Sequence, residues 1–180
     1  MIFFGLKKLE QNYDVDIRWR AYELRPAGSR QISPEYRARI EQSRPAFAER
    51  MMTAYGVMIK PGPFGIDSRK ALILDKYAEV PRLGDEFHIA VLEAYWQHGK
   101  DISDVNVLKE LAVQVGINPA MLDAALMEPV HAQAVDDDIA QAQAYGLTGV
   151  PAIVFNNRYL VMGAQPYETL AQAVKTAQAN

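Results

Sequence analysis

The 180 residues contain no cysteine. This absence excludes disulfide bonds, thiolate metal sites and a cysteine nucleophile anywhere in these residues. Long apolar runs are also lacking, since none approaches the roughly 20 residues that a membrane-spanning helix requires. The apolar stretch at 1–4 is too short for a signal peptide and is followed by none of its other features. We therefore expect a cytoplasmic protein that does not interact with a membrane.

The sequence also lacks a large excess of either acidic or basic residues. The formal net charge is −3 and the sequence pI is about 5.6. Arginines do cluster between residues 18 and 39, but acidic residues at 79–86 and 136–138 offset them. These values give no support to a nucleic-acid partner. The apolar content of 49% is that of an ordinary globular protein, and the length suits one domain, with room for an insertion.

A short hairpin is the clearest local signal in the sequence. Apolar runs at 152–155 and 159–162 flank Asn156-Asn157, which tolerate the positive φ angles of a tight turn. Pro151 stands where the first strand begins, a position at which its missing N–H group is harmless. An X-Pro bond is also the usual site of a cis peptide bond. From these residues alone, an ordinary turn proline is the alternative.

Helical patterns fill most of the remaining chain. The segment 15–24 instead alternates, with Val15, Ile17, Trp19 and Ala21 on one face, and this predicts a strand near a sheet edge whose basic outer face carries Arg18 and Arg20. Pro45 is expected to kink or split the long helix that follows Ser33. The expected helices cover residues 4–13, 33–55, 67–77, 81–98, 103–116, 118–127, 129–145 and the segment after 166.

A resemblance to a known family rests on five segments, which follow one another in the same order as in that family: 4–10, 17–26, 92–103, 148–155 and 163–166. These segments resemble the DsbA family of the thioredoxin superfamily. Within that family they are most similar to the FrnE-type branch, close to the 2-hydroxychromene-2-carboxylate isomerases. The resemblance implies an α/β, thioredoxin-like fold with a large all-helical insertion. It places the thioredoxin-like domain at 1–32 and 128–180 and the insertion at 33–127.

The sequence departs from this family at one essential point. Family members have a central strand that leads into a Cys-Pro-x-Cys motif at the start of the first helix. Alignment on Gly5 puts the second cysteine's place at Ile2, so the first central strand and the first cysteine fall before Met1. The strand is thus missing from this chain, and no catalytic residue is assigned. We expect the native start to lie upstream; a strand from another chain, or helices closing over the gap, are the alternatives.

The resemblance implies a cleft between the start of the first helix and the proline loop. By this resemblance, the full-length form of the protein would be a thiol–disulfide oxidoreductase. The chain as written should be redox-inactive, because it contains no cysteine. A glutathione-dependent isomerase, for which bound glutathione would supply the thiol, is an alternative, and a non-catalytic module that binds a peptide or thiol is another. The expected partner is a thiol or disulfide peptide or a small thiol, and homodimerisation is left open. The expected binding residues are Phe3, Phe4, Gly5, Gly149, Val150 and Pro151.

Other residue clusters are expected to be structural. His88 and His98 are ten residues apart and diverge by roughly 80° on one helix, so they form no ligand pair, and we expect no cofactor or metal held by protein ligands. The acidic run 136–138 is interpreted as a solvated helix face. The segment 61–65 is an irregular connection that, by the resemblance, could overhang the cleft. The methionines at 51, 52 and 58 are interpreted as helix packing.

Overall fold

The structure is a computed structural model that describes residues 2–26, 28–29 and 32–179, with the backbone alone at 2–4. Helices predominate, and a single hairpin supplies both strands of the described chain. The helices are α1 (Ile2–Asn12), α2 (Pro34–Tyr55), α3 (Arg69–Glu79), α4 (Gly84–Trp96), α5 (Val105–Gln114), the 3-10 turn η1 (Pro119–Met121), α6 (Leu122–Met127), α7 (Pro129–Ala144) and α8 (Tyr167–Gln178). The strands are β1 (Ala152–Phe155) and β2 (Tyr159–Met162).

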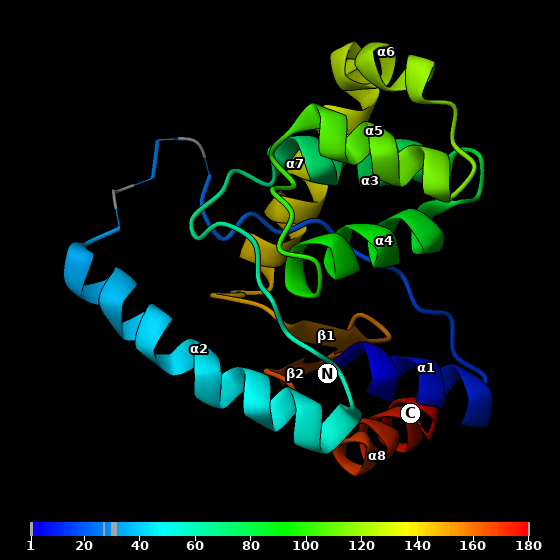
Figure 1. Cartoon of the computed structure of the whole chain (residues 1–180). Coiled ribbons are helices and arrows are strands. Elements are labelled where there is room, and N and C mark those ends of the chain that lie inside the picture. The colour runs from blue at the N-terminus through cyan, green and yellow to red at the C-terminus, as the bar shows by residue number, and fades with distance from the viewer. Residues whose placement is uncertain (1, 27, 30–31, 180) are drawn as a thin grey trace.

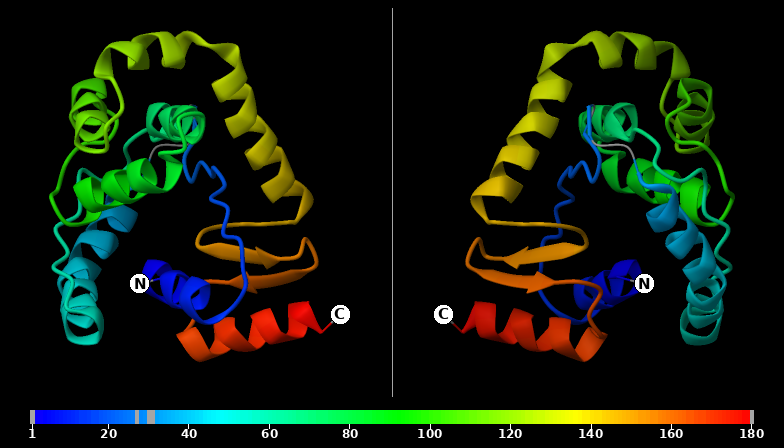
Figure 2. Two further views of the ribbon diagram at one scale, coloured as in Figure 1. Left: turned by 90° about the vertical axis from the view of Figure 1, so that its right-hand side faces the viewer. Right: turned by 90° about the vertical axis from the view of Figure 1, so that its left-hand side faces the viewer.

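The elements form a lower layer, an upper group of helices and one outlying helix. Figure 1 shows the hairpin with α1 and α8 in the lower part and α3 to α7 above it. Helix α2 lies to one side of both parts, and Figure 2 shows the same separation from two further directions. Both ends of the chain lie in the lower part, and Figure 2 shows them on opposite sides of it, at the start of α1 and at the end of α8.

The hairpin forms as its sequence predicts. Asn156 and Asn157 have φ angles of 50° and 54°, which close the turn between the two strands. The register pairs Ala152 with Met162 and Phe155 with Tyr159. A hydrogen bond from Gly163 N to the Pro151 carbonyl, 2.8 Å long, extends this pairing by one residue towards the loop before β1.

The lower layer packs one face of the hairpin on α1 and α8. Its buried centre contains Leu6 and Leu9 from α1 and Leu170 and Val174 from α8, and β1 and β2 contribute partly buried apolar side chains. The extended segment 15–19 supplies further partly buried residues to the same cluster. Segments from both ends of the chain therefore share one core, as the predicted thioredoxin-like arrangement requires.

The prediction of a strand at 15–24 is wrong. The segment is extended, and its side chains alternate between inward and outward as far as Ala21, which is buried. Its backbone makes no backbone hydrogen bond with another described residue. A strand needs a neighbour to complete its ladder, and β1 pairs only with β2 within the described chain. The alternation in the sequence thus predicts correctly which side chains face inward and which face outward. The segment forms no β-ladder, because no described strand lies next to it.

The upper helices enclose a separate and larger core. Leu74 of α3, Phe87 of α4, Leu108 of α5 and Leu122 of α6 are all fully buried in it. A smaller cluster of Ala21, Ile73 and Val135 joins the extended segment to α3 and α7. The division into a thioredoxin-like domain and an insertion at 33–127 remains a prediction. The core of the upper helices contains only residues of the predicted insertion, and the core of the lower layer contains only residues outside it.

Helix α2 begins at a well-formed N-cap and has little contact with either core. The Ser33 hydroxyl accepts a hydrogen bond from Tyr36 N, and Pro34 occupies the first helical position. The helix continues through Pro45, so the expected split is wrong. Of its 22 residues only Met51 is buried. None of the helices in the described residues combines the length and apolar character needed to cross a bilayer.

Candidate functional site

The loop that enters β1 presents an open stretch of backbone. The Val150–Pro151 peptide bond is cis, and Val150 is 50% exposed. A Cβ atom added to Gly149 would have no neighbour within 4 Å. Neither Gly149 nor Val150 makes a hydrogen bond with another described residue. The loop therefore offers free N–H and C=O groups next to an exposed apolar side chain.

The start of α1 is the other wall of the cleft that the family resemblance predicts. The side chains of Phe3 and Phe4 lie outside the described residues, so only Gly5 can be placed. A Cβ atom on Gly5 would lie 3.3 Å from Leu170 Cδ1, so this residue marks a close approach of α1 to α8. In Figures 1 and 2 the start of α1 is on the side of the hairpin from which the chain enters β1. Gly5 serves packing, and the loop at 149–151 is the accessible part of the expected site.

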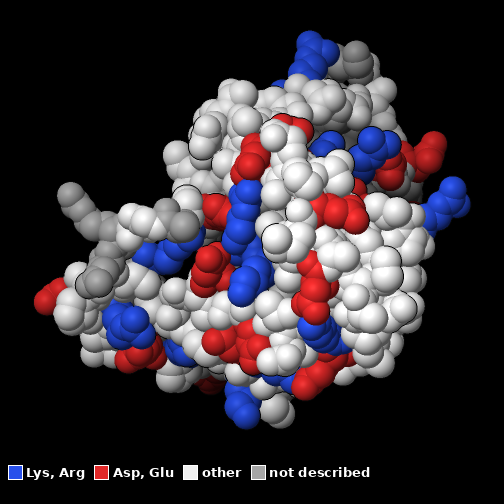
Figure 3. Space-filling view, turned by 90° about the horizontal axis from the view of Figure 1, so that it is seen from above, with Lys and Arg blue, Asp and Glu red and all other residues white. Residues whose placement is uncertain are grey.

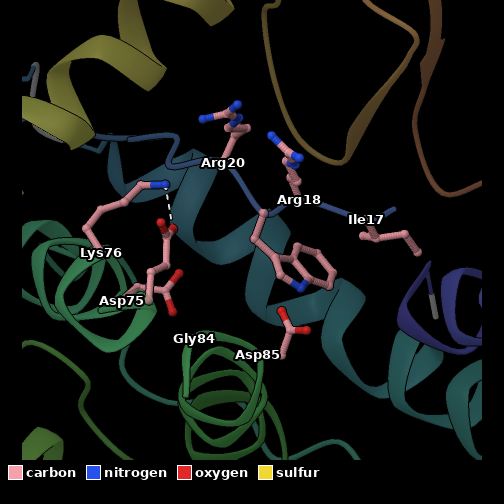
Figure 4. A pocket seen from close by; sticks show the side chains of 9 residues that line it. Ile17, Arg18, Arg20, Asp75, Lys76, Gly84 and Asp85 are labelled. Atoms are coloured by element: carbon pink, nitrogen blue, oxygen red, sulfur yellow. Dashed lines mark hydrogen bonds and ion pairs between the residues drawn. The ribbon is translucent and has the colours of Figure 1, made fainter. Parts of the chain in front are cut away.

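A polar pocket of about 380 Å³ lies between the extended segment and the α3–α4 turn. Figure 4 shows Arg18 and Arg20 extending from the segment, with Asp75, Lys76 and Asp85 coming from the helices on the other side. The pocket thus carries both acidic and basic side chains, and Figure 3 shows the two kinds mixed over one face of the molecule. The lining residues are Ile17, Arg18, Trp19, Arg20, Asp75, Lys76, Glu79, Gly84 and Asp85.

The interpretation of 136–138 as a solvated face is wrong for Asp138. Its side chain is only 4% exposed. Its carboxylate accepts hydrogen bonds from Lys76 Nζ at 2.8 Å, Arg20 at 3.0 Å and the Ala21 amide at 2.8 Å. The signal was present in the sequence, because Val135, Asp138 and Ala142 lie on one buried stripe of α7 at helical spacing. Asp138 therefore ties α7 to α3 and to the extended segment.

Lys76 is the buried cation of this network, with a side chain 7% exposed. Burial by itself lowers the pKa of Lys76. The hydrogen bonds and negative charges of Asp138 and Glu79 outweigh burial, so the pKa of Lys76 is raised above its ordinary value of 10.5. The charged form is thus the one that the folded protein stabilises.

This raised pKa predicts a loss of stability at alkaline pH. Because the folded pKa lies above the unfolded value, the contribution of Lys76 is complete below pH 10.5 and is lost as the pH rises through the folded pKa. We expect the difference in unfolding free energy between the wild type and Lys76→Met to shrink over that range, as measured by urea unfolding at a series of pH values. A difference that stays constant across the range would contradict the assignment.

An imidazole–carboxylate pair lies next to the pocket. His88 Nδ1 and Asp75 Oδ2 are 3.0 Å apart, and the His88 ring stacks on Trp19 with ring centroids 4.2 Å apart. The second oxygen of Asp75 is buried and has no hydrogen-bond partner among the described residues. Among the described residues, no group of three or more His, Asp or Glu is placed to hold a metal ion. Trp19, His88 and Asp75 therefore form a packed column between the extended segment, α4 and α3.

Comparison with known proteins gives the class of this fold. Residues 1–175 match the family model of the DSBA-like thioredoxin domain, and the chain belongs to this family. Among curated proteins, the chain is similar to the uncharacterized protein YwbO of Bacillus subtilis (strain 168). The two are 25% identical over 174 residues, which cover 92% of this chain and 84% of YwbO.

Solved structures show the same fold at low sequence identity. The probable DsbA oxidoreductase SCO1869 of Streptomyces coelicolor has a TM-score of 0.83 at 22% identity, covering 99% of this chain and 82% of that one. A putative protein disulfide isomerase of Nitrosomonas europaea has a TM-score of 0.71 at 20% identity, with coverage of 97% and 88%. A 2-hydroxychromene-2-carboxylate isomerase has a TM-score of 0.75 at 19% identity, with coverage of 95% and 85%. These structures confirm the thioredoxin-like fold with a helical insertion.

Proposed function

We propose that these 180 residues form a FrnE-like thioredoxin-fold module of the DsbA family that binds a ligand. The ligand is an extended peptide or a small thiol that binds along the loop at 149–151. Thiol–disulfide exchange requires a thiolate, and the 180 residues contain no cysteine. The chain by itself therefore binds the ligand without exchanging electrons with it.

One observation carries this proposal: the unpaired backbone of Gly149 and Val150. Free backbone N–H and C=O groups beside a strand are where an extended peptide can add main-chain hydrogen bonds. The exposed Val150 side chain offers an apolar contact beside them, and the open space over Gly149 leaves room for the ligand. Membership of the DSBA-like family supports a thiol or disulfide peptide as the class of ligand.

A glutathione-dependent isomerase is the second candidate function. Its support is the similarity in fold to 2-hydroxychromene-2-carboxylate isomerase. In that case bound glutathione would supply the thiol, and the chain's own residues would hold glutathione and the substrate. Glutathione-dependent turnover of a chromene-type acid by the 180-residue chain would favour this candidate over simple binding.

We expect ligand binding to be sensitive to a side chain added at Gly149. The backbone there has no positive φ angle and the space above it is open, so Gly149→Val can fold while its branched side chain blocks the loop. Binding of a peptide with an S-methylated cysteine should weaken about tenfold, which corresponds to roughly 1.4 kcal/mol. Isothermal titration measures the affinity, and the amide resonances of Gly149 and Val150 should shift during titration of the wild type.

The matched control is Ala140→Val, which adds similar bulk on the exposed face of α7 and should leave the affinity unchanged. If the amide shifts fall elsewhere and Gly149→Val binds like the wild type, the proposed site is wrong. In an insulin-reduction assay the 180-residue chain should give the buffer rate. Reduction above that rate would contradict the mechanism.

The location of the protein in the cell, its dimerisation and its lack of a nucleic-acid partner are three further predictions. A cytoplasmic location would be tested by cell fractionation, and homodimerisation by light scattering. The absence of a nucleic-acid partner would be tested by titration with labelled oligonucleotides.

A further inference from the structure

Three arginines surround the ring of Phe64. Their guanidinium carbons lie 6.0 Å (Arg25), 5.5 Å (Arg37) and 5.9 Å (Arg44) from the ring centroid. Phe64 belongs to the proline- and glycine-rich connection between α2 and α3, Arg25 follows the extended segment, and the other two arginines belong to α2. Residues far apart in the sequence thus gather positive charge around one aromatic ring.

These guanidinium groups have no acidic partner in the described residues. None of the three forms an ion pair, whereas Arg18, Arg20 and Arg69 all do. Glu41 is within one turn of Arg37 and Arg44 on the same helix, yet it pairs with neither. Like charges held close together repel one another, and cation–π contacts with a single ring compensate only modestly. An anion bound among them would relieve this repulsion.

The spacing along α2 favours a ligand larger than one small anion. Arg37 and Arg44 are seven residues apart, so they lie on the same face of the helix and are separated by roughly 10 Å along its axis. Arg39 extends the basic surface, since it lies over the Tyr36 ring at 5.0 Å. A segment with several acidic side chains can contact all of these groups at once, and one phosphate or carboxylate group cannot.

Exposed apolar side chains lie on α2, against it and in the connection that carries Phe64. Tyr36, with its ring 6.4 Å from that of Phe64, is 40% exposed. Trp96, whose ring contacts Phe47 of α2, is also 40% exposed, and Met58 is 68% exposed. Aromatic residues, methionine and arginine are the types enriched in protein–protein interfaces and their hot spots. The expected packing role of the methionines therefore fits Met51, which is buried, and does not fit Met52 or Met58, which are exposed.

We propose that the surface formed by Arg25, Arg37, Arg44, Phe64 and Tyr36, the Phe64 surface, binds an acidic segment of a polypeptide partner. The overall charge of −3 argues against a nucleic acid as the partner, because a long polyanion would also meet the acidic remainder of the molecule. Helix α2 stands apart from the two cores, so a partner can reach this surface. The proposal goes beyond the ligand site at 149–151 and uses none of its residues. An experiment can therefore contradict one of the two proposals without affecting the other.

Charge reversal at one arginine of the Phe64 surface tests the proposal. The probe is a fluorescein-labelled peptide of alternating glutamate and leucine residues, titrated with the full 180-residue chain and followed by fluorescence anisotropy. Arg44→Glu should weaken binding about tenfold or more, because it removes one attraction and adds a repulsion at the centre of the surface. Phe64→Leu, which keeps apolar bulk and removes the ring, should weaken binding by about threefold or more.

The matched control is Arg50→Glu, which makes the same change in charge on an exposed arginine of α2 that contacts no aromatic ring in the described part of the chain. It should alter the affinity less than twofold, and circular dichroism should show all variants folded. Equal weakening by Arg44→Glu and Arg50→Glu would overturn the proposal in favour of general electrostatic attraction. Inorganic phosphate or a single-stranded oligonucleotide that binds more tightly than the peptide would also overturn it. Failure of the wild type to bind the peptide would do the same.

Discussion

Replacing Asp138 with alanine is expected to lower the free energy of unfolding by about 3–5 kcal/mol, because it leaves a buried cation without its main partner. Lys76 would retain only the more exposed Glu79 as a counter-ion. The Ala21 amide, which is bonded to Asp138 at 2.8 Å, would lose its acceptor in a buried place. Arg20 contributes less, because its side chain is mostly open to solvent. Urea unfolding followed by circular dichroism measures the effect.

The neighbouring residue provides a control for the Asp138 prediction. Asp137 is exposed and its carboxylate accepts one hydrogen bond from Gln133. Asp137→Ala should therefore change the free energy of unfolding by no more than about 0.5 kcal/mol. The double variant Asp138→Leu/Lys76→Met removes both buried charges and should recover much of the loss. A small effect of Asp138→Ala, similar to that of Asp137→Ala, would show that the network does not hold α7 in place.

Phe87→Ala is expected to cost about 3–5 kcal/mol of stability, since it removes a large, fully buried ring from the core of the upper helices. A total stability of about 5–15 kcal/mol is typical of a domain, so this loss would bring the upper helices close to unfolding. The surrounding Leu74, Leu108 and Leu122 are themselves fully buried, and they cannot fill the cavity without moving. Thermal and urea unfolding measure the change.

Two substitutions calibrate the Phe87 prediction. Phe87→Leu keeps much of the volume and should cost clearly less than Phe87→Ala, whereas Val113→Ala on the exposed side of α5 should be nearly neutral. The shape of the transition also tests the proposed insertion at 33–127. If the insertion folds as a separate unit, Phe87→Ala should shift one of two transitions and leave the other unchanged. A single transition that shifts as a whole would mean that both cores unfold together.

Part of the candidate site could be predicted from the sequence, because it depends on local chemistry. Pro151 and the turn at Asn156-Asn157 identify the hairpin and the loop before it, since their backbone preferences need no partner far away in the chain. The family resemblance predicts Gly5 on the cleft wall, but its neighbour is Leu170, which only the packing of α8 on α1 brings there. The Phe64 surface was missed, because it combines a loop, a helix and the end of an extended segment.

The sequence by itself determines which residues form helices, where the hairpin turns and that no thiolate is available within the 180 residues. The helices and the turn follow from capping residues and periodicity, which depend only on residues close together in the sequence. The lack of a thiolate follows from the composition alone. Only the tertiary structure decides that 15–24 forms no ladder with any described strand, that Asp138 is buried with Lys76 and that three arginines share one ring. Each of these depends on a partner distant in the sequence, and local patterns cannot show whether such a partner is present.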